Sequence, residues 1–576
     1  MLPLTLALFT SVLTAPASAA TLAPGQTLPN ALGLHVSNGG LANLAGALAG
    51  VVPESFEEPS IAGEFECDSG DETPLGYAIN GLVANIEVTD SELVASDGRL
   101  DLTLKLALSV NADEVLITGD CTFLFKDLDQ SCDMDIPASD PIEVEVHLGM
   151  TMALLGTGAV DVEVDELTYD LGTIGNPLSG CTFGTVVDAL LALNPDFLSD
   201  LISSFLDPTL DGLPETLETT LEDALSGLNI ETSVAVLDAN LALTLAPSEL
   251  TLSDTGLLLG FGASVATDTL SDCADFGEGS EIFSDGWPAT GERAWDKDGY
   301  PKYDAAILLN KDFMDHLLWN VWASGALCGD LADLVSLPLD TSFVGGLYGE
   351  SFSAYFPEPL PVQLTLESPV QPTTRFAEDP ALFIDINSLG LNTAAPLDGR
   401  WTRMCQVGVD GWIALDPNIS SDGIAPDLIV DTEAFTFSEP YNELLESGYS
   451  DGIAGLLPTL LESLLPADLL PTIALPTWQG IGLDAVEWIP SDDGQWQGGF
   501  ATLKTDAVEP LEISGCSGCS GDTGSDPLGC SDSTGGCDSG CDGGTSCATG
   551  GRPNVARGRL AMLAGLVALF GTRRRR

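Results

Sequence analysis

Leu100-Asp-Leu-Thr-Leu-Lys-Leu-Ala-Leu-Ser-Val110 places an apolar residue at every second position, six in all. Side chains of a β-strand point alternately to opposite faces, so this strand would bury one face and turn the other outward. The pattern recurs in Ile142-Glu-Val-Glu-Val-His-Leu148 and Val160-Asp-Val-Glu-Val164. Strands with one polar face are typical of antiparallel sheets that meet water on one side. The sequence therefore predicts a one-sided antiparallel sheet here.

Helical patterns lie on both sides of these strands. Residues 31–50 contain three leucines at the spacing of one helix face, and residues 183–228 carry a longer apolar stripe with steps of three to four residues. Alternating strands resume over 234–245 and 257–265. This order of helix, sheet, helix and strands predicts an α+β unit.

The same order starts again after a loop-rich bridge at about 266–300. A second opening helix is predicted over 307–328 and a second Leu-rich helix over 453–470. Strands of the second unit are predicted over 362–366, 382–386, 412–415, 481–489 and 499–504. A repeat of about 240 residues indicates an internal duplication of one unit.

Three segments then carry a family resemblance: Gly33-Leu-His-Val-Ser-Asn-Gly-Gly-Leu41, Asn310-Lys-Asp-Phe-Met-Asp-His-Leu317 with its continuation to Leu327, and Leu469-Leu-Pro-Thr-Ile473 with its continuation to Leu483. In this order they resemble the opening helix, the helix that opens the second half, and the closing segment of the family of bactericidal/permeability-increasing protein and lipopolysaccharide-binding protein. That family belongs to the tubular lipid-binding superfamily. The resemblance spans about residues 27–506.

The resemblance implies two tandem elongated barrels, each a twisted antiparallel sheet wrapped around a long amphipathic helix. The first barrel would span 27–270 and the second 290–506. Each would hold an apolar or amphipathic lipid between helix and sheet and could transfer it. The implied lipid-binding residues lie on the helical stripes: Leu41, Leu44, Leu48, Val187, Leu190, Leu191, Leu198, Leu201, Ile202, Phe313, Leu317, Val321, Leu457, Leu461 and Leu464.

A leucine stripe opposite a sheet is also the ordinary pattern of a packed core. The alternative function is therefore a surface adhesin or structural protein with solidly packed barrels and no ligand. Four tryptophans leave a similar choice between the mouth of an apolar pocket and packing at the junction of the barrels: Trp287, Trp295, Trp319 and Trp322.

The chain is strongly acidic, with 87 Asp and Glu against 18 Lys and Arg and a formal net charge of −69. Such a surface repels nucleic acid, anionic head groups and lipopolysaccharide phosphates, so we exclude these as partners. Members of the family that bind lipopolysaccharide use a basic tip on the first barrel. Here Arg99, Lys105 and Lys126 are the only basic residues before residue 293. We expect a lipid or another apolar small molecule as the partner instead.

Both ends of the chain have the sequence patterns of processing signals. Residues 1–19 are apolar and end in Ala17-Ser-Ala19, which predicts a signal peptide, with a buried first helix as the alternative. A Cys/Gly/Ser-rich spacer over 507–555 precedes a short hydrophobic helix and an arginine cluster over 556–576. This tail resembles a myxobacterial-type C-terminal sorting signal, with a plain tail anchor as the alternative. We expect export to the cell surface or outer membrane, with membrane contact only through the tail.

Export makes disulfides the default state of the cysteines. Cys121 and Cys132 flank a predicted hairpin that would bring them together. The resemblance also implies a bridge from a strand to the later helix of the first barrel, where Cys181 stands at the start of the helix and its partner is left open. The sequence lacks a phosphate loop and an H-E-x-x-H motif, and its three histidines are scattered without a neighbouring cluster of metal ligands. We therefore predict no catalytic residues, no metal site, no cofactor and no enzymatic activity.

Overall fold

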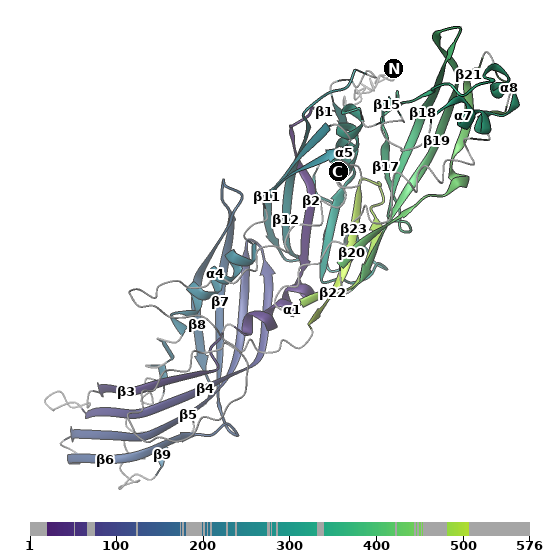
Figure 1. Ribbon diagram of the computed structural model, residues 1–576. Coiled ribbons are helices and arrows are strands. Elements are labelled where there is room, and N and C mark those ends of the chain that lie inside the picture. The colour runs from purple at the N-terminus through teal and green to yellow at the C-terminus, as the bar shows by residue number, and fades with distance from the viewer. Residues whose placement is uncertain are drawn as a thin grey trace, which may run out of the picture.

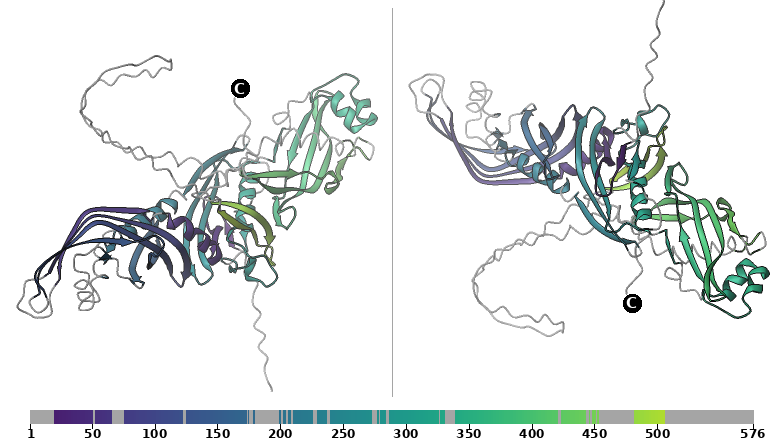
Figure 2. Two further views of the ribbon diagram at one scale, coloured as in Figure 1. Left: turned by 90° about the horizontal axis from the view of Figure 1, so that it is seen from below. Right: turned by 90° about the horizontal axis from the view of Figure 1, so that it is seen from above.

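Three seven-stranded sheets and one two-stranded pair follow one another along an elongated molecule (Figure 1). The structure is a computed structural model that describes residues 20–505, except 51, 66–74, 122–124, 173, 175–177, 180–198, 200–201, 204–205, 208–209, 226–228, 237–238, 273–276, 278, 284–285, 326, 331–338, 421–422, 443–444, 446–447, 451 and 453–480. Figure 2 shows the N-terminal sheet, in purple and blue, at one end of the molecule and the C-terminal sheet, in green, at the other.

The N-terminal sheet is built around one long strand, β5, which extends the predicted strand at 100–110 in both directions. β5 pairs with β4 along its length, whereas its other edge is shared: residues 110–121 pair with β6 and residues 100–108 with β7. The sheet comprises β3 (Ser55–Phe65), β4 (Leu75–Ser96), β5 (Arg99–Cys121), β6 (Phe125–Ile136), β7 (Ile142–Leu154), β8 (Val160–Leu171) and β9 (Leu178–Ser179). All of its pairings are antiparallel, as the alternating sequence predicts.

In the C-terminal sheet, too, one edge of the longest strand is shared by two partner strands. Its long strand β19 pairs with β18 on one edge, while residues 414–420 pair with β20 and residues 405–410 with β21 on the other. The sheet comprises β15 (Gly329–Asp330), β16 (Gln363–Glu367), β17 (Thr373–Phe376), β18 (Leu382–Leu397), β19 (Arg400–Ser420), β20 (Gly423–Ile429) and β21 (Thr436–Asn442). The shared topology is consistent with the predicted duplication.

The central sheet joins the two halves. Its order is β10-β11-β12-β2-β14-β23-β22, and the neighbours β2 and β14 run antiparallel at its middle. Its strands are β2 (Thr27–Ser37), β10 (Ile230–Val236), β11 (Ala239–Ser253), β12 (Gly256–Thr267), β14 (Ala305–Asn310), β22 (Ile481–Pro490) and β23 (Trp496–Thr505). On either side of the β2–β14 pair lies the last strand of the same half, β12 or β23. Strands from both sides of the bridge at 266–300 thus share one sheet, and the predicted domain limits stay predictions.

Both opening helices begin later than predicted. β2 occupies residues 27–37, so α1 spans Asn38–Ala49, and β14 occupies 305–310, so α5 spans Lys311–Ala323. The Ser37 hydroxyl accepts a hydrogen bond from Gly40 N–H (3.2 Å), and the Asn310 side chain accepts one from Asp312 N–H (2.9 Å). These side chains satisfy backbone donors of the first helical turn and so fix the switch from strand to helix.

The predicted α+β class is confirmed, with five α-helices among the described residues. The other three are α4 (Leu213–Leu225), α7 (Thr341–Tyr348) and α8 (Glu350–Tyr355). A short pair joins β1 (Ala20–Leu22) to β13 (Ser280–Ile282). The predicted arrangement of two barrels, each a sheet wrapped around a long helix, is not confirmed: among the described strands no closed barrel is found, and every sheet has free edges. The helix predicted over 183–228 is described in part, and the helix predicted over 453–470 lies outside the described residues.

Candidate functional site

The inward face of β5 is aliphatic from end to end. Its inward side chains are each at most 4% exposed: Leu100, Leu102, Leu104, Leu106, Leu108, Val110, Ala112, Val115 and Ile117. At about 3.3 Å per residue the run from Leu100 to Ile117 is about 55 Å long. Helix α1 has 12 residues and so measures about 18 Å at 1.5 Å per residue. The aliphatic face is therefore about three times as long as the helix.

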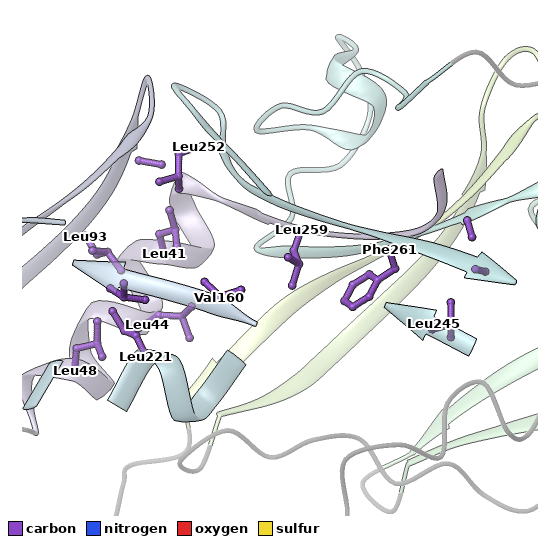
Figure 3. Close-up of a cluster of buried hydrophobic side chains, with 14 of the residues drawn as sticks. Leu41, Leu44, Leu48, Leu93, Val160, Leu221, Leu245, Leu252, Leu259 and Phe261 are labelled. Atoms are coloured by element: carbon purple, nitrogen blue, oxygen red, sulfur yellow. The ribbon is translucent and has the colours of Figure 1, made fainter. Parts of the chain in front are cut away.

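Helix α1 is fixed at the end of this face nearest the central sheet. The Asn38 side chain donates to Asp254 O (2.8 Å) and accepts from Ala95 N–H (2.9 Å), so it ties the first turn to β4 and to the turn after β11. Leu41, Leu44 and Leu48 are buried. Figure 3 shows them beside Leu93 of β4, Val160 of β8 and Leu221 of α4. At this end the space between helix and sheet is filled by side chains.

Helix α4 covers the free edge of β8. Its Leu213, Leu217 and Leu221 lie on one face at steps of four residues and are buried. On the flank of the helix, Glu218 Oε1 accepts a hydrogen bond from Val164 N–H (2.8 Å), and Glu222 Oε1 accepts one from Val162 N–H (3.2 Å). Unpaired N–H groups of an edge strand otherwise invite pairing with another chain. The two carboxylates accept hydrogen bonds from these N–H groups of β8, and the helix covers this side of the interior.

In the second half, helix α5 is buried with several polar side chains. Asp315 Oδ1 accepts from Thr374 N–H (2.7 Å) and from the Thr374 hydroxyl (2.8 Å), and Asp315 also pairs with Lys311. His316 Nδ1 lies 2.8 Å from the Ser280 hydroxyl, and burial lowers the pKa of His316 to about 4. These contacts attach α5 to β17 and β13. Helix α5 is therefore part of a packed core.

The predicted lipid-binding residues divide into two groups. Seven are described and all are buried: Leu41, Leu44, Leu48, Ile202, Phe313, Leu317 and Val321. Eight lie outside the described residues: Val187, Leu190, Leu191, Leu198, Leu201, Leu457, Leu461 and Leu464. Burial fits both a lipid pocket and a packed core, so their role stays a prediction.

Two of the described cysteines are buried, one in each half of the chain. Cys132 is buried on β6, while the side chains of Cys121 and Cys181 lie outside the described part, so their pairing stays a prediction. Cys405 is a free buried cysteine, and burial raises the pKa of its thiol to about 12. Within the described ranges, no three His, Cys, Asp or Glu side chains gather to hold a metal ion, and no helix is long and apolar enough to cross a bilayer.

The four tryptophans separate in space. Trp319 and Trp322 are buried together on α5. Trp287 and Trp295 lie at the central sheet, where they line a pocket together with Trp496 of β23. Sequence reasoning missed Trp496. Its signal was an aromatic residue in the glycine-containing strand Trp496-Gln-Gly-Gly-Phe500, which leaves room for large rings from elsewhere.

Comparison with known proteins gives distant structural likenesses. No protein-family model and no curated protein matches the chain. A crystal structure of lipopolysaccharide binding protein is similar at 14% identity and a TM-score of 0.48, over 83% of this chain and 99% of that one. Takeout 1 of Epiphyas postvittana is similar at 12% identity and a TM-score of 0.21, over 33% and 90%. P47 of Clostridium botulinum E1 is similar at 10% identity and a TM-score of 0.20, over 83% and 100%. At these values none of them tells what this chain binds.

Proposed function

We propose that this protein binds an apolar or amphipathic lipid along the aliphatic face of its N-terminal sheet, without chemical turnover. The observation that carries the proposal is the run of nine buried aliphatic side chains on β5, which extends well beyond the length of α1. Its neighbour β4 contributes Ile79, Leu82 and Ala84, which are also buried. A long face without polar side chains suits an acyl chain, which needs length and no hydrogen bonds.

The expected affinity follows from the number of methylene groups buried. Each buried CH₂ contributes about 0.8 kcal/mol, so ten contribute about 8 kcal/mol, which corresponds to a micromolar Kd before ordering costs. The net charge of −69 disfavours anionic head groups. We therefore expect an uncharged or zwitterionic lipid, with transfer between membranes as one use of such binding.

The second candidate is a surface adhesin or structural protein with a solid core. The packing of Leu41, Leu44 and Leu48 against Leu93, Val160 and Leu221 favours it, because no ligand fits where side chains already touch. The two candidates differ in what occupies the face of β4 and β5 away from α1.

Replacing Ala84 with Trp tests this difference. Ala84 is buried on the inward face of β4 beside Val110, whereas its neighbour Asn85 is exposed on the opposite face. If lipid occupies the face, the Ala84→Trp indole takes its place. Lipid recovered by solvent extraction and mass spectrometry then falls at least severalfold, while the melting temperature changes little. Asn85→Trp is the matched control and keeps the lipid.

A solid core gives the opposite result. Overpacking then lowers the stability of Ala84→Trp by about 1–3 kcal/mol or more, and neither the parent protein nor either variant yields bound lipid after incubation with phosphatidylcholine vesicles. That combination would reject the lipid proposal.

We further propose that the protein is exported and held at the cell surface by its tail. The support is the signal-like segment 1–19 and the tail 507–576, both outside the described residues. In the source organism, the full chain should fractionate with surface membranes, and a chain ending at residue 506 should appear in the medium. Retention of the shortened chain on the cell would contradict the anchoring role.

A further inference from the structure

The segment between the two halves covers the second face of the central sheet. Along β12, Leu259 and Phe261 point into the main core, whereas Leu258 belongs to a separate cluster on the other face. That cluster comprises Leu258, Ala294, Trp295, Tyr303, Ala306, Leu308, Ile489, Trp496 and Phe500. Part of the predicted loop-rich bridge is thus an aromatic layer packed on a sheet, separate from the core to which the aliphatic side chains of β5 belong.

Two glycines leave room for the ring of Trp287. Gly33 of β2 and Gly260 of β12 are paired in register. A Cβ atom would lie 2.9 Å from the Trp287 ring at Gly33 and 2.3 Å from it at Gly260. Because neither residue has a side chain, the indole can lie directly against the sheet, where its ring centroid is 5.3 Å from that of Trp496.

Beside this indole lies a pocket of about 470 Å³ with aromatic walls, a volume in the range of small-molecule sites. The aromatic residues of its lining are Phe283, Trp287, Trp295 and Trp496. Phe283 is 55% exposed and Trp287 is partly exposed, so both present ring surface that a ligand can reach. The Phe283 N–H donates to Asp312 Oδ2 (2.9 Å), which ties this residue to the first turn of α5.

The charged part of the lining is negative overall. The turn between β22 and β23 contributes Asp492 and Asp493, and the lining also includes Lys297, whose ammonium pairs with Asp492. Asp493 Oδ1 accepts from the Ser491 hydroxyl (2.5 Å) and from the Gln495 N–H (3.0 Å), and these hydrogen bonds lower the pKa of Asp493. Asp493 is therefore ionised at neutral pH, and two carboxylates stand against one ammonium.

The Trp287 indole adds to the attraction for a cation. An aromatic ring has a negative face and a positive edge. At the edge of this ring, Nε1–H donates to Glu249 Oε2 (2.8 Å), so a carboxylate binds the positive side. The negative face remains, and tryptophan is the best of the aromatic residues at binding a cation over its ring.

We propose that this pocket binds a quaternary ammonium group, such as the trimethylammonium group of choline. Its methyl groups would pack on the rings of Phe283 and Trp287, and its charge would be attracted by the ring faces and by the carboxylate of Asp493. The net charge of −69 raises the concentration of cations near the whole surface. This binding does not depend on lipid at the aliphatic face of β5.

Other classes of ligand fit the lining less well. A metal ion needs several oxygen ligands, and within the described ranges no three His, Cys, Asp or Glu side chains gather to supply them. A primary ammonium needs hydrogen-bond acceptors, but Asp492 and Asp493 already accept from groups of the protein. A quaternary ammonium carries its charge without N–H donors and needs no free acceptor. An anion would be repelled by both carboxylates.

The test is titration of the full chain with choline and tetramethylammonium at constant ionic strength, measured by tryptophan fluorescence and calorimetry. Choline should bind saturably with a Kd of about 1 mM or below. It should bind at least about tenfold more tightly than its neutral analogue, which has a tert-butyl group in place of trimethylammonium. Glycerophosphocholine identifies the source of the group: tighter binding than that of choline indicates a lipid head group, and weaker binding indicates a free cation.

Two variants at exposed positions separate the ring from the charge. Phe283→Leu keeps an apolar side chain but removes the ring, and should weaken choline binding about fivefold. Asp493→Asn removes the charge, and should weaken binding about threefold at an ionic strength of about 0.01 M and less at about 1 M. The melting temperature of each variant shows that it is folded.

Each variant has a matched control away from the pocket. Tyr355→Leu removes a ring that is 42% exposed on α8, and Asp211→Asn removes an exposed carboxylate just before α4. Both should bind choline as the parent does. The proposal is overturned if neither choline nor tetramethylammonium binds, if the neutral analogue binds as tightly as choline, or if folded Phe283→Leu and Asp493→Asn keep the affinity of the parent.

Discussion

His316 shows how burial couples one side chain to pH. Its pKa is lowered from 6.5 to about 4 because burial disfavours the charged ring. In the unfolded chain the ring gains its proton as the pH falls through 6.5, whereas in the folded protein it stays neutral until about pH 4. The contribution of His316 to the free energy of unfolding is therefore fully present above pH 6.5. It is lost as the pH falls from 6.5 to about 4.

We predict that His316→Gln flattens the loss of stability on acidification. The fall in pKa from 6.5 to about 4 corresponds to a loss on the order of 3 kcal/mol in the parent between about pH 7 and about pH 4, and the variant should lack that part. Urea unfolding at a series of pH values measures it. His147→Gln, at a half-exposed position on β7, should follow the parent. A variant curve parallel to the parent curve would contradict the assignment to His316.

Gly260 gives a second prediction at the level of one residue. A Cβ atom there would lie 2.3 Å from the Trp287 ring, so the methyl group of Gly260→Ala must displace the indole from its position against the sheet. We expect a loss of about 1–3 kcal/mol in the free energy of unfolding and a red shift of tryptophan emission. Gly346→Ala in α7 is the control, because nothing lies within 4 Å of its added Cβ. There the better helix propensity of alanine should stabilise the protein by about 0.5–1 kcal/mol.

At the level of elements, strands were predicted more accurately than the points where strands become helices. Alternation in 100–110, 142–148 and 160–164 identifies β5, β7 and β8, because each strand buries only one face. The residues before Ser37 and Asn310 lie in the middle of the central sheet. Apart from His35 they are apolar or glycine on both faces, so the spacing of their apolar residues does not distinguish a strand from a helix. The capping residues themselves carried the signal that was missed.

The candidate interior was predictable in its parts but not in its assembly. The leucine spacing on α1 is visible in the sequence, yet the approach of α4 to α1 and β8 depends on contacts between residues far apart in the chain. The same holds for Trp287 and Trp496, which a common sheet brings together. Periodicity shows which face is apolar, and only the topology shows what that face meets.

Helix α4 yields a prediction about the edge of β8. Glu218→Ala removes the acceptor of Val164 N–H and should lower the free energy of unfolding by about 1.5–3 kcal/mol, the range for a hydrogen bond to a charged group. Thr219→Ala, at the exposed neighbouring position on the same helix, should cost little. Chemical denaturation measures both, and hydrogen exchange should show faster exchange at Val164 in Glu218→Ala alone. Equal stability of the two variants would show that the edge does not need this cap.

At the level of the whole molecule, folding concentrates a large negative charge. Of the 18 basic residues, several are already paired: Arg99 with Asp101, Asp165 and Glu166, and Lys105 with Asp90. The 87 acidic residues outnumber the 18 basic ones by 69, so most of the negative charge is not neutralised by ion pairs. Charges of one sign destabilise a compact state through mutual repulsion.

Salt should therefore stabilise this protein. Raising the ionic strength from about 0.01 to about 1 M shortens the Debye length from about 30 to about 3 Å, which screens repulsion between carboxylates more than it weakens the few ion pairs. We expect the melting temperature to rise by about 5 °C or more, equally in NaCl and KCl. Arg99→Gln leaves three carboxylates without their cation, so it should lower the melting temperature more at low salt than at high salt. A melting temperature that falls with salt would mean that the ion pairs, and not the unpaired carboxylates, dominate the electrostatic free energy of folding.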